Sequence, residues 1–97
     1  MTKSREIRTK ILKIMDLALK ISPPEKTREE HEPNAFVEYS AHVNMITVRC
    51  FKYGDYHGRA DYEASIYMDE KCANEKLDET IEYLRNLREE INNVSKN

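Results

Sequence analysis

Apolar residues repeat at helical spacing at both ends of the chain. They recur every three or four positions in residues 5–21 and again in residues 74–92. Because an α-helix has about 3.6 residues per turn, this spacing places them along one face. The pattern therefore predicts a helix in each segment. The inward-facing residues would be Ile7, Ile11, Ile14, Ala18 and Ile21 in the first helix, and Leu77, Ile81, Leu84, Leu87 and Ile91 in the second.

The middle of the chain alternates between apolar and polar residues. Period-two alternation predicts strands at residues 35–43, 45–53 and 61–68, with a tight turn near Val43–Asn44. One face of the sheet would point toward the helices. Its residues would be Val37, Tyr39, Ile46, Val48, Cys50, Tyr62, Ala64, Ile66 and Met68. The opposite face, here named the open face, would carry Glu38, Ser40, His42, Thr47, Arg49, Phe51, Tyr53, Glu63, Ser65 and Tyr67.

These elements predict one α+β domain covering residues 1–97, a length typical of a single domain. The economical arrangement is a three-stranded antiparallel sheet with both helices on one face. Residues 22–34 contain no apolar side chain apart from proline, so they form a linker. Asp69 and Asn74 are both suitable caps for the second helix, and the sequence leaves that choice open.

The net charge of −2 conceals a gradient along the chain. Residues 1–22 are basic, whereas residues 23–68 and 69–94 are acidic. A nucleic-acid-binding chain is usually basic overall, so this balance does not favour that class. The polar N-terminus, the absence of a long apolar run and the isolated cysteines Cys50 and Cys72 predict a cytoplasmic protein without a membrane span.

Motifs for catalysis, metals and cofactors are missing from the sequence. The three histidines and two cysteines form no CxxC, HxxxH or HExxH motif, and two glycines cannot supply a phosphate-binding loop. Ser40 and His42 would share a strand face with Glu38, but no glycine elbow or orienting carboxylate accompanies them. We interpret that row as a solvated face, and we predict no enzyme, no metal site and no cofactor.

The loop between the second and third strands has the composition of a binding surface. Tyr53-Gly-Asp-Tyr-His-Gly-Arg59 joins two tyrosines, a histidine and an arginine, which are common in interface hot spots. The alternative is a hairpin whose aromatic residues cover the end of the sheet. Aromatic residues of the open face would form an adjoining patch without an obvious cover. We predict partner binding by Arg49, Phe51, Tyr53, Tyr56, His57 and Tyr67.

The first helix carries more apolar residues than one contact with a sheet requires. A homodimer through this helix is therefore expected. The apolar set in question is Ile7, Ile11, Leu12, Ile14, Met15 and Leu19.

The chain resembles small αβββα proteins encoded by phages and prophages of Firmicutes, among them some anti-CRISPR proteins. The resemblance covers about residues 35–90 and involves Phe36-Val-Glu-Tyr-Ser-Ala-His-Val-Asn44, the glycine-bearing hairpin and Ile81-Glu-Tyr-Leu84. It implies a non-enzymatic accessory factor that binds a host or phage protein in the host cytoplasm, for example to inhibit a CRISPR nuclease. Anti-CRISPR proteins that mimic DNA are much more acidic, so a local protein contact is expected instead.

Binding of nucleic acid through the open face is the alternative function. The order of elements resembles that of double-stranded RNA-binding domains, which place lysines at the start of their second helix. The matching stretch here, residues 69–76, is acidic overall. Single-stranded bases could instead stack on Phe51 and Tyr67 beside Arg49. The neighbouring Glu38 and Glu63 oppose that interpretation because they repel phosphate.

Overall fold

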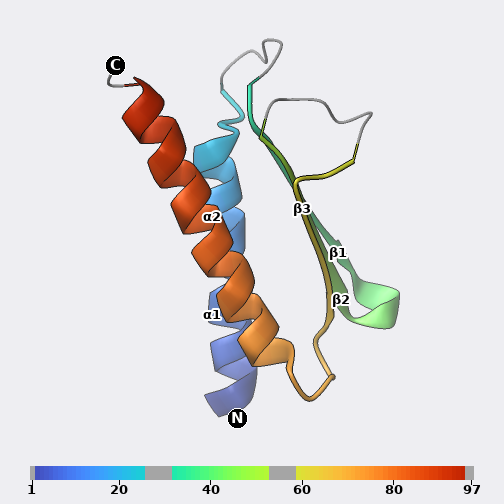
Figure 1. Ribbon diagram of the computed structural model, residues 1–97. Helices are drawn as coiled ribbons and strands as arrows, with labels where there is room; N and C mark the ends of the chain where they lie inside the picture. The colour runs from blue at the N-terminus through green and yellow to red at the C-terminus, as the bar shows by residue number, and fades with distance from the viewer. Residues whose placement is uncertain (1, 26–31, 53–58, 96–97) are drawn as a thin grey trace.

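Two helices cover one face of a three-stranded antiparallel sheet in the computed structural model, which describes residues 2–25, 32–52 and 59–95 (Figure 1). The α+β arrangement predicted from the sequence is confirmed. The elements in chain order are α1 (Thr2–Ile21), β1 (Asn34–Ser40), a 3-10 turn (Ala41–Val43), β2 (Met45–Phe51), β3 (Tyr62–Tyr67) and α2 (Ala73–Ser95). No helix within the described residues is both long and apolar enough to cross a membrane.

The central strand β2 pairs with β1 on one side and with β3 on the other. Ile46 lies between Tyr39 and Ile66 in this register, and Val48 lies between Val37 and Ala64. Directly opposed residues of paired strands project to the same face. The register therefore places the apolar rows predicted from the sequence on one face, which both helices cover.

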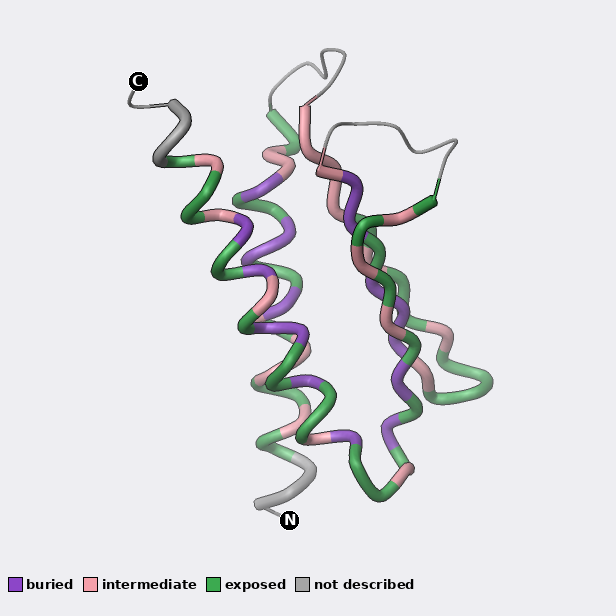
Figure 2. Tube along the Cα trace, viewed as in Figure 1, coloured by how far each residue is buried: buried purple, intermediate pink, exposed green. Residues whose placement is uncertain are grey.

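The core lies between the sheet and the helices, where buried positions of the two layers face each other (Figure 2). Ile66 and Met68 are buried, whereas Glu63 and Ser65 on the alternate positions of β3 are exposed. The predicted assignment of the two faces is confirmed by this contrast. The helices contribute Ile14, Leu17, Ala18 and Ile21 from α1, and Ala73, Leu77, Ile81, Leu84 and Leu87 from α2.

Tyr39 departs from this pattern because it belongs to the edge strand. It shares a face with Ile46, but it is 52% exposed and so is not a core residue. Its hydroxyl donates a hydrogen bond to Asn44 Oδ1 at 2.8 Å. The prediction of Tyr39 as an inward-facing core residue is therefore wrong.

The first strand ends three residues before the predicted boundary. Ala41–Val43 form a 3-10 turn, and Asn44 follows with φ 53°, a left-handed conformation that asparagine adopts more readily than most residues. His42 is consequently exposed on the turn and does not extend the row of Glu38 and Ser40. The predicted Glu38–Ser40–His42 row is wrong at its last member.

Polar contacts join α2 to its neighbours in the fold. Lys10 Nζ of α1 lies 2.9 Å from Asp78 Oδ1 and donates to Asn74 Oδ1 at 3.1 Å. The buried Thr80 hydroxyl donates to the Lys76 carbonyl and shares a 2.8 Å hydrogen bond with Tyr62 Oη of β3. Because α2 begins at Ala73, neither Asp69 nor Asn74 immediately precedes the helix, so neither of the two expected caps occupies that position.

Replacement of Ile66 tests the assignment of the two faces. Ile66→Ala should lower the free energy of unfolding by about 2–5 kcal/mol, because it leaves a cavity in the core. Ser65→Ala is the control on the adjacent exposed position and should change it by about 0.5 kcal/mol or less. Urea denaturation measures both values. Equal effects of the two substitutions would contradict the assignment.

Candidate binding site on the open face

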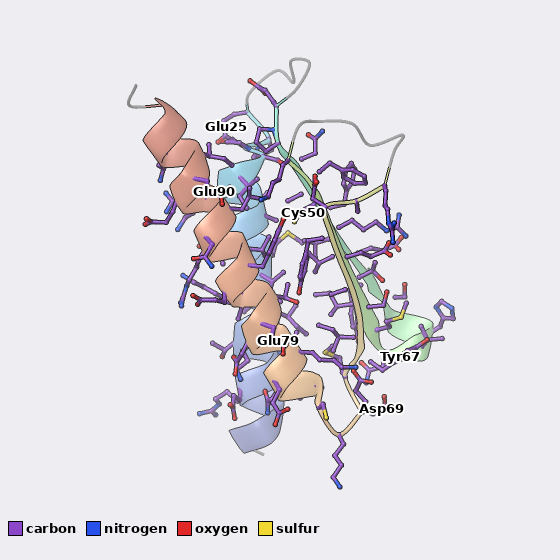
Figure 3. The ribbon with its side chains drawn as sticks, in the orientation of Figure 1. Glu25, Cys50, Tyr67, Asp69, Glu79 and Glu90 are labelled. Carbon is purple, nitrogen blue, oxygen red and sulfur yellow. The ribbon has the colours of Figure 1, made fainter. Side chains whose placement is uncertain are left out.

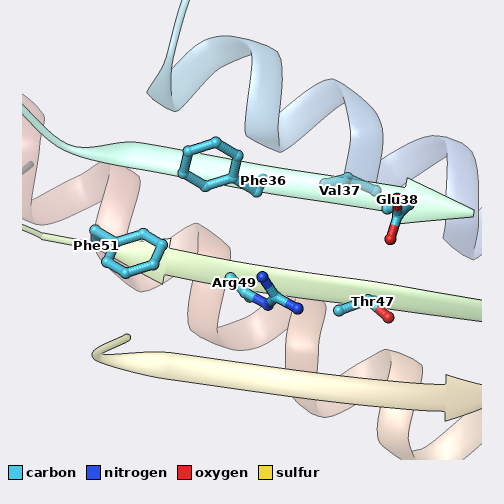
Figure 4. Close-up of a pocket in the computed structure, with 6 residues that line it drawn as sticks. All are labelled: Phe36, Val37, Glu38, Thr47, Arg49 and Phe51. Carbon is cyan, nitrogen blue, oxygen red and sulfur yellow. The ribbon is translucent and has the colours of Figure 1, made fainter. Parts of the chain in front are cut away.

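The open face of the sheet carries a hollow of about 460 Å³. Figure 4 views this face with the helices behind the strands. Residues of β1 and β2 form the hollow, and β2 contributes its outward-facing positions. The lining residues are Phe36, Val37, Glu38, Thr47, Arg49 and Phe51.

Two phenylalanines form the aromatic end of the hollow. The rings of Phe36 and Phe51 meet edge to face, with centroids 5.6 Å apart and planes at 89°. This geometry is favourable because the positive edge of one ring meets the negative face of the other. Phe51 is only 7% exposed, whereas Phe36 is 48% exposed. A buried ring thus supports an accessible one.

An ion pair crosses the sheet beside these rings. Arg49 Nε lies 2.9 Å from Glu63 Oε2, and the two residues are direct partners in the β2–β3 register. Both side chains are more than half exposed, so the pair contributes little to stability, about 0.2–1 kcal/mol. Its effect is on the surface charge, because Glu63 neutralises the arginine. Glu38 is the remaining charged residue on the outward positions of the strands.

The structure separates the residues predicted to bind a partner. Arg49 and Phe51 both line the hollow. Tyr67 pairs with Met45 at the other end of β2, six residues from Phe51, which corresponds to about 20 Å along a strand. Figure 3 shows Tyr67 beside the turn that leads to α2. A single patch containing both Phe51 and Tyr67 was therefore a wrong expectation, and so was an exposed Phe51.

The other three predicted binding residues, Tyr53, Tyr56 and His57, lie outside the described residues. Their binding role stays a prediction. The same applies to the central part of the predicted linker, residues 26–31.

Phe36 is a site residue that the sequence did not single out. It alternates with Glu38 and Ser40, so the period of two already places it on the open face. Its position at the start of a strand, next to the linker, gave no sign of a binding role. Only the register, which sets Phe36 opposite Arg49 and diagonal to Phe51, shows that it joins the aromatic end of the hollow.

Burial keeps two potential nucleophiles of the described residues protonated. Cys50 lies between the sheet and the helices (Figure 3), and burial raises the pKa of its thiol to about 12. Burial likewise raises the pKa of the Tyr83 hydroxyl to about 12. Both groups therefore stay protonated at neutral pH and are poor nucleophiles. No group of three or more histidine, cysteine or acidic residues within the described part of the chain could hold a metal ion.

Comparisons with protein-family models, with curated proteins and with solved structures gave no match. The function is therefore inferred from the open face itself.

Thiol labelling tests the burial of Cys50. Near pH 8, about the ordinary pKa of a free cysteine, a chromogenic disulfide such as DTNB should label one thiol per native chain quickly. The labelled residue should be the exposed Cys72. Denaturation should make the second thiol reactive. Equal rates for both thiols in the native protein would contradict the buried position of Cys50.

Truncation of each phenylalanine tests their different roles. Phe51→Ala should lower the free energy of unfolding by about 3 kcal/mol, because it empties a buried position. Phe36→Ala should lower it by about 1 kcal/mol at most, mainly through loss of the ring contact. Urea denaturation compares the two variants. A larger loss for Phe36→Ala than for Phe51→Ala would refute the support of Phe36 by Phe51.

Proposed function

We propose that this chain is a non-enzymatic protein-binding factor, and that the hollow on the open face takes a short partner segment with an apolar side chain next to a basic one. The observation that carries this proposal is the half-exposed Phe36 ring, which rests on the buried Phe51 ring inside the hollow.

The aromatic end supplies the apolar contact. A phenylalanine that is already held by a neighbouring ring loses little conformational freedom when a partner covers it. Aromatic anchors of this kind dominate many protein interfaces. Phe36 supports the proposal because it is accessible, anchored and adjacent to a concave surface.

The charges of the open face favour a basic partner. Arg49 is paired with Glu63, which leaves the carboxylate of Glu38 as the excess charge beside the hollow. A lysine or arginine of the partner would complement Glu38. Cations that contact phosphate groups supply most of the affinity for nucleic acid, so the same arrangement disfavours nucleic acid.

The resemblance to phage-encoded accessory proteins suggests the biological class of the partner. On that basis we propose a host or phage protein in the host cytoplasm, with inhibition of a host defence system, such as a CRISPR nuclease, as the role. A site centred on one aromatic anchor suits a local contact of this kind.

A displayed library of random peptides tests the proposal even while the partner is unidentified. Selection on the immobilised wild-type chain, with counterselection on Phe36→Ala, should enrich peptides that place an aliphatic or aromatic residue next to lysine or arginine. Phe36→Ala should weaken the best peptide about 30-fold, equivalent to the roughly 2 kcal/mol of a hot-spot residue. Calorimetry with the purified peptide measures this change.

Tyr67→Ala is the matched control, since Tyr67 is a similarly exposed aromatic residue at the far end of the open face. It should leave the affinity for the peptide unchanged. The affinity of the wild-type chain for the peptide should fall only modestly when the salt concentration rises from about 50 to 200 mM. Enrichment of no peptide, or of acidic peptides, would contradict the proposal. Tight and strongly salt-dependent binding of a single-stranded oligonucleotide that Phe36→Ala abolishes would favour nucleic acid instead.

A further inference from the structure

The polar end of the hollow contains a buried hydroxyl group. Thr47 lies on the central strand β2, between Glu38 of β1 and Ser65 of β3, and these three residues form one row on the open face. Thr47 lines the hollow, yet it is only 8% exposed. The other buried polar residue in the described part of the chain, Thr80, uses its hydroxyl in two hydrogen bonds within the protein.

The Thr47 hydroxyl, in contrast, has no hydrogen-bond partner within the residues that the structure describes. A polar group that leaves water without gaining a partner costs free energy. The small exposed part of Thr47 lies in the hollow, since Thr47 is one of its lining residues. The hydroxyl is therefore available to a ligand that enters the hollow.

Glu38 supplies a carboxylate next to this hydroxyl. Glu38 and Thr47 are direct partners in the β1–β2 register. Their Cβ atoms are therefore about 5 Å apart on the same face. Figure 4 shows the Glu38 carboxylate extending from β1 toward β2. Glu38 is exposed and forms no ion pair within the described residues, so the two side chains offer free hydrogen-bond acceptors side by side.

The nearby Arg49 does not occupy these acceptors. Its Nε lies 2.9 Å from Glu63 Oε2 on β3, across β2 from Glu38. The charges of Arg49 and Glu63 offset each other, which leaves the Glu38 carboxylate to set the charge of the polar end. That end of the hollow therefore suits a cation that also donates hydrogen bonds.

We infer that Glu38 and Thr47 form a subsite for the ammonium group of a lysine, and that Thr47 makes the hollow select lysine over arginine. This subsite rests on the proposed function, because the lysine belongs to the partner segment whose apolar side chain contacts Phe36.

An ammonium group matches the two acceptors. Its three N–H donors diverge from one nitrogen, so one can bond the Glu38 carboxylate while another bonds Thr47 Oγ. Hydrogen bonds of about 2.9 Å let one nitrogen bridge two side chains whose Cβ atoms are about 5 Å apart. A guanidinium group is planar and pairs best with both oxygens of a single carboxylate. It would bond Glu38 in this way and leave the buried hydroxyl of Thr47 without a partner.

The shape of the subsite favours the same choice. Thr47 is almost fully buried, so only a narrow group reaches its hydroxyl. Lysine carries a compact head on an unbranched stem, whereas the fork of arginine is broad. Phe36 lies two positions before Glu38 on the same face, about 7 Å away along the strand. An apolar side chain on Phe36 and a lysine at Glu38 and Thr47 can therefore come from one short segment.

Strand propensity is the alternative reason for a threonine at this position. β-Branched side chains favour strands, and valine has nearly the same shape as threonine. Thr47→Val thus removes the hydroxyl and keeps the strand former. Because the hydroxyl bonds no described residue, the midpoint of urea denaturation should not fall in this variant. A fall would show that the fold itself uses the hydroxyl, and would contradict the subsite.

Calorimetry with two forms of one peptide tests the selection of lysine. The probe is a peptide enriched by the display selection, synthesised with either lysine or arginine at its basic position. Both forms carry the same charge, so their affinities differ through hydrogen bonding and shape. The wild-type chain should bind the lysine form about 10-fold more tightly, the effect of one hydrogen bond to a charged group. Thr47→Val should weaken the lysine form about 10-fold and leave the arginine form unchanged.

Two further variants complete the test. Thr47→Ser keeps a hydroxyl and should retain the preference for lysine. Ser65→Ala removes the exposed hydroxyl on the other side of Thr47 and should leave both affinities unchanged. Equal binding of the two peptide forms by the wild-type chain would overturn the subsite, and so would a preference for lysine that persists in Thr47→Val.

The outcome also separates this subsite from the proposed function. Peptides that prefer arginine, and that Phe36→Ala weakens, would leave the proposed function intact and overturn only the selection of lysine. A display selection that enriches no peptide would refute the proposed function and the subsite together.

Discussion

Burial of the inner side of β2 is the interaction on which the rest of the structure depends. Ile46, Val48 and Cys50 are fully buried between the two neighbouring strands and both helices. Shifting β2 by one residue would turn these three side chains away from the core and put charged Arg49 in their place, so the register is strongly fixed. That register also determines which residues face away from the helices. The hollow with Phe36, Arg49 and Phe51 therefore follows from the packing of the core.

The sequence was sufficient to predict the order of the elements and the inward row of β3, because both depend on local periodicity. Ile66 and Met68 alternate with Glu63 and Ser65, and the structure buries the first pair as expected. The end of β1 was not predictable in the same way, since it depends on the left-handed conformation of Asn44. The positions of site residues along the sheet depend on pairing between strands. Periodicity alone therefore could not separate Tyr67 from Phe51.

The open face combines an accessible aromatic residue with a buried one. Phe36 on the open face is supported from below by Phe51, and its surroundings combine an aromatic contact with an excess carboxylate. The proposed function therefore assigns this surface to a segment of a different protein.

Chemical-shift mapping tests most directly whether the hollow binds a partner. A selected peptide would be titrated into the isotopically labelled full chain while backbone and aromatic resonances are followed. The largest changes should occur at Phe36, Glu38 and Arg49, with little change at Tyr67 or along α2. Changes centred on α2 or on Tyr67, with Phe36 and Arg49 unaffected, would contradict the assignment of the binding site to the hollow.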